Sequence, residues 1–467
     1  MTPRSLAWIA QAANGVLHGG DRLIDALATD SRTLPRGKAA MFVALAGENF
    51  DGHDHVASAA AGGCVAALVA RVVDAGIPQI VVHQTERALA DIASAAQRGR
   101  ATKVLAVTGS NGKTSVKALL QSILGQLGGA HATPGNRNNE IGLPLAVLDA
   151  PDDARFAIYE MGAGKPGDIA YLTAIARPDV ALVNNIAPAH LERLGNLLGV
   201  ADTKAAIYDA LPADGVAVIN ADDAFAPYFM ARAQGRRTLR FGLDASAEIT
   251  ARDIREHGDS SRFVLVSQQG EVDVTLPLPG RHNIRNALAA AGMALGVGAT
   301  LDQIRGGLEA AQPVAGRQVT HRLRCGALLI DDSYNANPGS VDAAIDALAA
   351  ACASSDGDEA WLVLGDMREL GADEALLHRQ VGARAKASGV ARLYTLGALS
   401  AEASDAFGEG ARHMGSHTQL TQALLRDLRP ALRVLVKGSR GSAMDLVVTA
   451  LLASDAAAGN AGETDAA

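Results

Sequence analysis

The chain has 467 residues, of which 48% are hydrophobic and 20% charged, with a net charge of −8 at pH 7. Because single hydrophobic cores stop growing at roughly 250–300 residues, this length predicts two or three globular domains. The negative charge excludes a basic face for nucleic acid, and no apolar run reaches the roughly 18 residues that cross a bilayer, so we expect a cytoplasmic protein without membrane insertion.

The first hundred residues alternate short apolar runs with helical segments. Residues 39–47, 64–70 and 79–83 have the composition of buried strands. A polar segment near residue 100 then precedes a new strand that begins at Val104. We therefore place a small N-terminal α/β domain at 1–100.

The pattern from 101 to 312 is typical of a parallel sheet with helical connections. Near-continuous apolar runs at 154–162, 179–187 and 215–223 each end in polar residues, as strands buried on both faces do. Ligands bind at these carboxyl ends in open α/β sheets. Period-two alternation within 246–277 predicts a hairpin. We assign this whole region to a central domain.

A second series of α and β patterns fills 313–455, which we assign to a C-terminal domain. Its strands are expected within 325–338, 360–367, 391–397 and 432–441. The tail at 456–467 has no hydrophobic periodicity, and we expect it to be disordered. The predicted fold class is α/β with three domains in series.

The segment "TGSNGKTS" at 108–115 is typical of a phosphate-binding loop. Its glycines let the backbone approach a phosphate, and the free N–H groups of the following helix attract anions. Lys113 is placed to reach the terminal phosphates and Thr114 to bind Mg²⁺. The alternative is an ordinary turn with a solvated lysine. The predicted nucleotide-binding residues are Thr108, Gly109, Ser110, Asn111, Gly112, Lys113, Thr114 and Ser115.

Further motifs follow in the order found in the Mur ligases of peptidoglycan synthesis and their folate-polyglutamate relatives, which the chain resembles except in its tail. They are "TPGNRNNEIGLP" (133–144), "YEMGAGKPGDIAYL" (159–172), "NNIAPAHLERLG" (184–195), "PGRHNIRNALAA" (279–290), "IDDSYNANPGS" (330–340), "LGDMREL" (364–370) and "VKGSRGSAMD" (436–445). The resemblance implies a central P-loop-type parallel-sheet ATPase domain, a C-terminal Rossmann-like domain and an N-terminal domain that binds a UDP-sugar. It also implies an ATP-dependent ligase that works through an acyl phosphate.

The segment "YNANP" resembles the branch of this family that adds D-alanyl-D-alanine to UDP-N-acetylmuramoyl-tripeptide. The "DNPR"-type motif of the ligases that add the third residue is absent. The expected partners are therefore two small-molecule substrates, and nothing in the sequence demands an assembly beyond a monomer. The alternatives are another ligase of the superfamily and a non-catalytic nucleotide-binding regulator.

The resemblance also implies residues that bind metal and ATP. Thr114, Glu160, His190 and Lys204 are expected to hold Mg²⁺ at two sites, with Lys204 carbamylated by CO₂. The alternatives are a surface histidine at position 190 and an exposed helix lysine at 204. Arg317 is expected to reach the ATP phosphates when the C-terminal domain closes. The predicted catalytic set is Lys113, Glu160, His190, Lys204 and Arg317.

The remaining candidates contact the nucleoside and the two substrates. Asn283 and Asn286 lie one helical turn apart and are expected to hold adenine, with a helix cap as the alternative. Asp332 is expected to bind the ribose. The candidates for the UDP side are Ser31, Arg32, Gly47, Asp51 and His53. Asn138 and Asn139 could bind phosphate or a substrate carboxylate, or could instead form turns. The candidates for the carboxylate of the incoming dipeptide are Asn335, Asn337, Lys437, Ser439 and Arg440.

Overall fold

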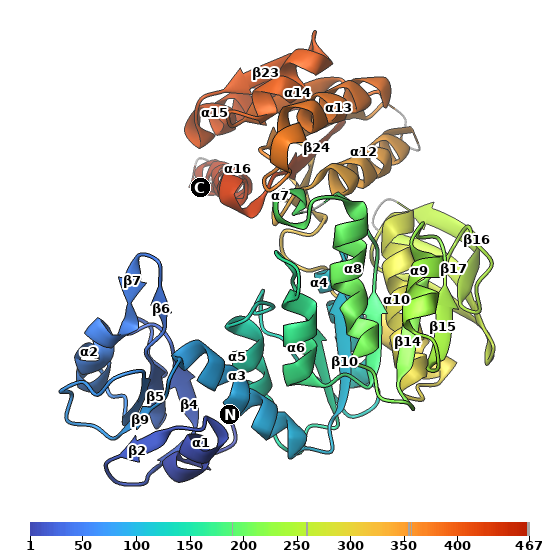
Figure 1. Cartoon of the computed structure of the whole chain (residues 1–467). Coiled ribbons are helices and arrows are strands. Elements are labelled where there is room, and N and C mark those ends of the chain that lie inside the picture. Colours follow the sequence, from blue (N-terminus) through green and yellow to red (C-terminus); the bar gives the residue numbers. More distant parts are fainter. Residues whose placement is uncertain (189, 258–259, 354, 356, 465–467) are drawn as a thin grey trace.

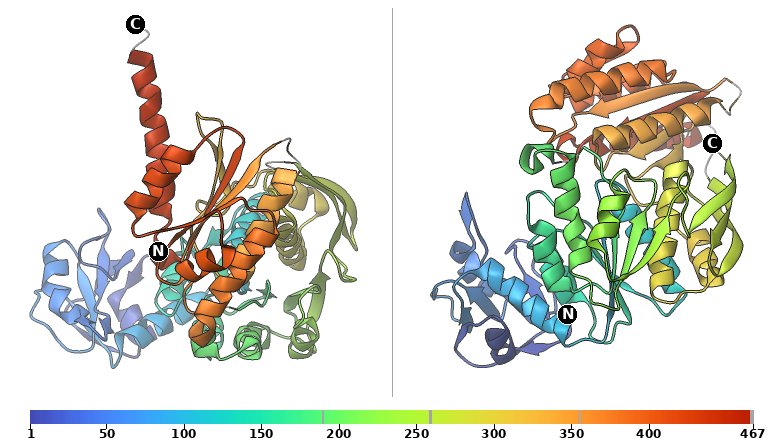
Figure 2. Two further views of the ribbon diagram at one scale, coloured as in Figure 1. Left: turned by 90° about the horizontal axis from the view of Figure 1, so that it is seen from above. Right: turned by 45° about the vertical axis from the view of Figure 1, so that its right-hand side comes forward.

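The computed structural model describes residues 1–188, 190–257, 260–353, 355 and 357–464, and it divides the chain into three regions (Figure 1). The C-terminal region lies over one end of the central region, and the N-terminal region lies at the side of the opposite end (Figures 1 and 2). None of the helices in the described residues is long and apolar enough to span a membrane.

The N-terminal region contains a five-stranded sheet in the order β2-β9-β8-β5-β4. Its strands are β2 (Val16–His18), β4 (Ala26–Ala28), β5 (Ala40–Val43), β8 (Ala66–Val69) and β9 (Gln79–Val81). The three strands expected from the sequence are confirmed as its centre. The other elements are β1 (Arg4–Ser5), β3 (Leu23–Ile24), α1 (Leu6–Ala12), α2 (Val56–Ala61), α3 (Thr85–Arg98) and the ribbon β6 (Ala46–Gly47) and β7 (Phe50–Asp51).

Helix α3 connects this region to the central one through a shared core. Its residues Leu89 and Ile92 belong to the same buried cluster as Leu143 and Leu172 of the central region. The burial of about four such side chains contributes several kcal/mol to the contact. The N-terminal region is therefore held by apolar packing, and the domain limit at residue 100 stays a prediction.

The central region is built on a six-stranded parallel sheet in the order β11-β12-β10-β13-β14-β15. The strands are β10 (Lys103–Thr108), β11 (His131–Ala132), β12 (Phe156–Glu160), β13 (Val180–Val183), β14 (Val216–Asn220) and β15 (Arg237–Phe241). The strand order reverses beside β10, so the carboxyl ends of β10, β12 and β13 open the crevice where ligands bind in such sheets.

Helices cover both faces of this sheet, which is why its strands are apolar on both sides. The helices are α4 (Lys113–Gly125), α5 (Gly142–Asp149), α6 (Asp168–Ala176), α7 (Leu191–Leu194), α8 (Leu197–Asp209), α9 (Ala226–Arg232), α10 (Arg281–Gly296) and α11 (Leu301–Glu309). Helices α4, α10 and α11 pack together on one face, and α5, α6 and α8 lie on the other.

The hairpin expected at 246–277 is a three-stranded antiparallel meander. It consists of β16 (Thr250–His257), β17 (Ser260–Ser267) and β18 (Gly270–Leu276). The first strand, "TARDIREH", is mostly polar and carries a bulge between Arg252 and Arg255, so its period-two signal is weak.

The C-terminal region has a six-stranded sheet in the order β19-β20-β24-β21-β22-β23, in which only β19 is antiparallel. The strands are β19 (Val319–Arg322), β20 (Leu328–Asp332), β21 (Glu359–Gly365), β22 (Arg392–Leu396), β23 (Ala411–Met414) and β24 (Leu432–Lys437). The helices are α12 (Pro338–Ala353), α13 (Glu374–Ala387), α14 (Ser400–Phe407), α15 (His417–Asp427) and α16 (Asp445–Thr464). Short 3-10 turns occur at Gly52–His55, Gly371–Asp373 and Arg440–Ser442.

The expectation of a disordered tail from residue 456 differs from the structure. Helix α16 continues to Thr464 and projects away from the body of the protein (Figure 2). The segment after Asp455 begins with three alanines, the best helix formers, and extending an existing helix avoids the cost of nucleation. Residues 465–467 of the expected tail lie outside the described residues.

Candidate active site

The predicted phosphate-binding loop joins the end of β10 to the start of α4. Gly112 is the residue before the helix and has a φ of 78°. Lys113 folds back over the loop, where its Nζ donates to the carbonyl oxygens of Gly109 at 2.7 Å and Ser110 at 3.4 Å. The lysine charge therefore lies against the loop that is expected to hold the phosphates.

Two asparagines at the end of β13 brace this loop, and neither was among the predicted site residues. The backbone N–H of Asn111 donates to Asn185 Oδ1 at 2.8 Å, and the side-chain amides of Asn184 and Asn185 donate to the Asn111 carbonyl. Their only sequence signal is a pair of polar residues at the end of an apolar strand.

Glu160, at the end of β12, contacts the loop directly. Its Oε2 accepts a hydrogen bond from Thr114 Oγ1 at 3.1 Å, and its Oε1 accepts one from Asn138 Nδ2 at 2.9 Å. Lys117 Nζ, which was not predicted, lies 3.2 Å from Oε2. Burial would raise the pKa of the Glu160 carboxyl, but Lys117, Lys113 and the hydrogen bonds lower it below its usual range. The buried carboxylate is therefore held in its charged form.

A cavity of about 360 Å³ lies over this cluster. We call it the acceptor cavity, because we expect the substrate groups that react with the nucleotide to bind here. It brings together the predicted residues Lys113, Glu160 and His190 with groups of the C-terminal region. The other predicted residues in its wall are Asn138, Asn139, Arg317, Asn335 and Arg440. The acceptor cavity therefore joins two regions of the chain.

His190 links the central region to the C-terminal region. Its Nδ1 lies 2.6 Å from Glu369 Oε2, and both residues have a positive φ, of 55° and 64° respectively. The hydrogen bond with His190 lowers the pKa of the Glu369 carboxyl and outweighs burial, which raises it. The histidine is thus a partly exposed group with a partner on the facing region.

Lys204 on α8 is only 1% exposed, which excludes the exposed helix lysine considered as its alternative. Burial, together with the neighbouring charge of Lys113 and against the opposing effect of Asp168, lowers the pKa of its amine to about 7. Lys113 and Asp168 both line the acceptor cavity. Lys204 therefore lies near that cavity with an amine that is partly neutral at pH 7.

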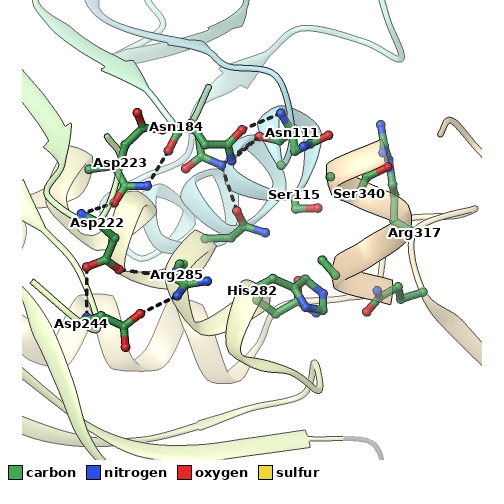
Figure 3. A pocket seen from close by; sticks show the side chains of 18 of the residues that line it. Asn111, Ser115, Asn184, Asp222, Asp223, Asp244, His282, Arg285, Arg317 and Ser340 are labelled. Atoms are coloured by element: carbon green, nitrogen blue, oxygen red, sulfur yellow. Dashed lines mark hydrogen bonds and ion pairs between the residues drawn. The ribbon is translucent and has the colours of Figure 1, made fainter. Parts of the chain in front are cut away.

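A larger cavity of about 670 Å³ lies on the other side of the loop, and we call it the nucleotide cavity (Figure 3). The predicted residues that line it are Asn111, Gly112, Ser115, Asn283, Asn286, Arg317, Asp332 and Lys437. Its wall also holds polar residues that were not predicted, namely Asn184, Asn185, Asn220, Asp222, Asp223, Asp244, His282, Arg285, Gln318 and Ser340. Figure 3 shows Arg285 reaching Asp222 and Asp244 at one end of the cavity and Arg317 at the other.

The two predicted adenine residues are tied to the scaffold. Asn286 Oδ1 accepts from Asn184 Nδ2 at 3.1 Å, and Asn283 Nδ2 donates to the Pro279 carbonyl at 2.7 Å. Both are buried in the wall of the nucleotide cavity, so they shape it as well as face it.

Arg317 lies where the two cavities meet. It lines both of them, and among the described residues its Nε is buried without a hydrogen-bond partner. A buried donor without an acceptor is costly, so this N–H is suited to an anionic ligand. Its guanidinium carbon lies 4.2 Å from the ring centroid of Tyr334.

Some of the residues predicted to bind the dipeptide carboxylate contact other protein groups, and others line a cavity. Lys437 Nζ pairs with Asp332 Oδ2 at 2.6 Å inside the protein. Ser439 Oγ accepts from the backbone N–H of Arg368. Asn337 Nδ2 donates to Asn111 Oδ1 at 2.8 Å, which places this residue at the phosphate loop. Of the five C-terminal candidates, only Asn335 and Arg440 face the acceptor cavity.

The UDP-side candidates lie in the N-terminal region and line neither cavity. Arg32 pairs with Asp30 on the surface. His53 Nδ1 contacts Asp51 Oδ1 at 2.5 Å, while its Nε2 accepts from the backbone N–H of Ala70 at 2.8 Å. Asp51 and His53 therefore stabilise the conformation of their own loop.

Thr108, the first residue of the predicted nucleotide-binding loop, is buried, and its hydroxyl donates to the Met161 carbonyl.

A glycine-containing strand-to-helix loop that faces a cavity shared with a second α/β region is typical of enzymes that bind a nucleotide. Comparisons with known proteins narrow this class. Residues 107–294 match the Mur ligase middle domain, and residues 316–440 match the Mur ligase glutamate ligase domain. The chain belongs to the Mur ligase family, and it is a ligase enzyme.

Its relatives match it over nearly their whole length. UDP-N-acetylmuramoyl-tripeptide--D-alanyl-D-alanine ligase of Escherichia coli (strain K12) is 43% identical, over 96% of this chain and 98% of the relative. A crystal structure of MurF from Acinetobacter baumannii is 32% identical, with a TM-score of 0.89 over 97% of this chain and 99% of that one. The MurF ligase of Thermotoga maritima in complex with ADP is 27% identical, with a TM-score of 0.80 over 92% and 97% of the two chains.

Gly112→Ala is expected to destabilise the fold and to weaken ATP binding. The new Cβ would lie 2.5 Å from both Asn184 Nδ2 and Asn286 Oδ1, at a φ of +78° that alanine rarely adopts. We expect a loss of about 2–4 kcal/mol in the free energy of unfolding, measured with urea, and a higher KM for ATP. Gly235→Ala is the matched control, because its φ is +84° with nothing within 4 Å. Equal losses in the two variants would contradict the steric explanation.

Proposed function

We propose that this chain joins D-alanyl-D-alanine to UDP-N-acetylmuramoyl-tripeptide at the expense of ATP. The products are UDP-N-acetylmuramoyl-pentapeptide, ADP and phosphate. The observation that carries the proposal is the acceptor cavity, whose wall combines Lys113 of the phosphate loop with Asn335 and Arg440 of the C-terminal region. The relative that is 43% identical carries this substrate pair in its name.

The chemistry requires an activated carboxylate. The tripeptide carboxylate attacks the γ-phosphorus of ATP, the bond from that phosphorus to the bridging oxygen breaks, and an acyl phosphate and ADP form. The amine of the dipeptide then attacks the acyl carbon, loses a proton and expels phosphate. Positioning and charge neutralisation dominate phosphoryl transfer. Lys113, which lines the acceptor cavity, and Arg317, which lines both cavities, would supply positive charge there.

The residues around Glu160 fit a magnesium ion, which supplies further charge neutralisation at the phosphates when it is bound. Thr114 and Glu160 offer hard oxygen ligands that already touch each other, and His190 lines the same cavity. The described residues hold no group of three or more His, Cys, Asp and Glu side chains arranged around one point. This fits Mg²⁺, which usually keeps several waters and takes one or two carboxylates together with substrate phosphates.

We include Lys204 as a carbamylated residue in this proposal. Reaction of its neutral amine with CO₂ forms a C–N bond and releases one proton, which turns a buried cation into an anion. Burial supports this assignment because it favours the uncharged amine that reacts. The carbamate would supply a further oxygen ligand for a second Mg²⁺.

The N-terminal region is proposed to hold the UDP group and Arg440 the dipeptide carboxylate, because a guanidinium forks onto a carboxylate. We also propose that the chain works as a monomer in the cytoplasm.

Phosphate release tests this function directly. The purified chain is incubated with ATP, Mg²⁺ and UDP-N-acetylmuramoyl-tripeptide, and then with D-alanyl-D-alanine, diaminopimelate, lysine or glutamate as the amine. We expect rapid release only with D-alanyl-D-alanine. Release with a single amino acid acceptor would assign another ligase of the superfamily, and no release with any acceptor would contradict the proposed function.

A further inference from the structure

The ring of Tyr334 contacts arginines from both cavities. The guanidinium carbon of Arg317 lies 4.2 Å from the ring centroid, and that of Arg440 lies 5.8 Å from it. Arg317 lines the nucleotide cavity and the acceptor cavity, whereas Arg440 lines the acceptor cavity and not the nucleotide cavity. One aromatic side chain therefore contacts two arginines, one in the wall of both cavities and one in the wall of the acceptor cavity.

The backbone fixes the ring relative to Arg317. The N–H of Tyr334 donates to the carbonyl of Gly316 at 3.2 Å, and Gly316 directly precedes the arginine. Gly316 has a φ of +69°, and a Cβ at this position would lie 3.1 Å from the Tyr334 Cβ. The close approach of these two segments sets the distance between ring and guanidinium.

Packing on a ring leaves the N–H edge of a guanidinium free to bind an anion. Among the described residues, the buried Nε of Arg317 has no acceptor. Arg440 is largely exposed, and its nearest ion-pair partner is Asp445 at 3.5 Å. Tyr334 therefore orients both cations without occupying the donors that their ligands need.

We propose that Tyr334 is a positioning residue that couples nucleotide binding to the binding of the dipeptide carboxylate, an inference that rests on the proposed function. A phosphate that immobilises Arg317 also immobilises the ring, so Arg440 loses less conformational freedom when it binds a carboxylate. By linkage, the dipeptide tightens nucleotide binding by the same factor.

The test measures this factor by calorimetry. A non-hydrolysable ATP analogue is titrated into the full chain with Mg²⁺ and UDP-N-acetylmuramoyl-tripeptide, with and without saturating D-alanyl-D-alanine. For the wild type we expect the dipeptide to tighten analogue binding about fivefold to tenfold. Tyr334→Leu and Tyr334→Met should abolish the tightening, and Tyr334→Phe, which keeps the ring, should retain it. Arg440→Met should also abolish it, although the analogue still binds.

Two non-aromatic variants are used so that the test still stands if one of them folds poorly. The melting temperature of each variant shows whether it is folded. Tightening that persists in Tyr334→Leu or Tyr334→Met, or that is lost in Tyr334→Phe, would overturn the role of the ring. An active wild type without any tightening would overturn the coupling alone. A wild type that releases no phosphate with D-alanyl-D-alanine would contradict the proposed function instead.

Discussion

Lys113→Ala is expected to lower kcat about 100-fold to 1000-fold, which is the usual effect of removing one group that stabilises charge in a transition state. In the structure Lys113 Nζ lies against the Gly109 carbonyl, and it lines the cavity that also contains Glu160. Burial lowers the pKa of its amine. Bound phosphates would oppose this effect, because their negative charge stabilises the charged form of the lysine. The rate of phosphate release with saturating substrates measures the effect.

The control for this variant is Lys103→Ala. Lys103 begins the same strand, β10, but it is 55% exposed and pairs with Asp179 at the end remote from the loop. Loss of such a surface ion pair changes stability by less than about 1 kcal/mol, and kcat should stay within about twofold. If Lys113→Ala also retains the wild-type kcat, the loop does not act on the transferred phosphate.

Lys204→Ala is expected to reduce activity at least about 100-fold and to regain part of it when a short-chain carboxylic acid is added. The acid would occupy the space of the lost carbamate and restore an anionic oxygen near the metal. Lys386→Ala is the control, because Lys386 lies on the surface of α13 and donates to the Glu409 carbonyl. It should lose no activity and should not respond to the acid.

The modification also has a direct signature and a pH dependence. Wild-type protein in ¹³C-labelled bicarbonate should show a carbamate carbon by NMR that Lys204→Ala lacks. Only the neutral amine reacts with CO₂, and the pKa of Lys204 is lowered to about 7. The carbamate signal should therefore be strong above pH 7 and decline as the pH falls through 7. A pH-independent activity without a carbamate signal would contradict the assignment.

The residues that could be predicted are those that belong to a short local sequence pattern with a known chemical role. The loop at 108–115 has its glycines, lysine and threonine within one strand-to-helix connection, so its anion-binding geometry follows from local backbone rules. Glu160 was found because it ends an apolar strand, and the carboxyl ends of parallel strands share one edge of a sheet. His190, Lys204 and Arg317 came from the family resemblance alone.

The residues that were missed depend on contacts between segments far apart in the chain. Lys117 looks like an ordinary helix lysine until its Nζ is found beside Glu160. Glu369 meets His190 only across two regions, and Tyr334 meets Arg317 and Arg440, which come from other segments of the C-terminal region. Asp51 and His53 contact each other in the structure, and their assignment to the UDP side stays a prediction.

Local sequence was thus sufficient for the α/β class, the positions of the main strands along the chain and the strand-to-helix loop at 108–115, because strand burial and loop geometry depend on neighbouring residues. The tertiary structure alone decided how the C-terminal region faces that loop, which side chains share each cavity and which charges lie close enough to shift a pKa. These properties depend on distances between groups separated by up to a few hundred residues, such as the hydrogen bond between Asn111 and Asn337. Such distances arise only when the hydrophobic cores of the three regions pack and bring remote polar groups to a common edge.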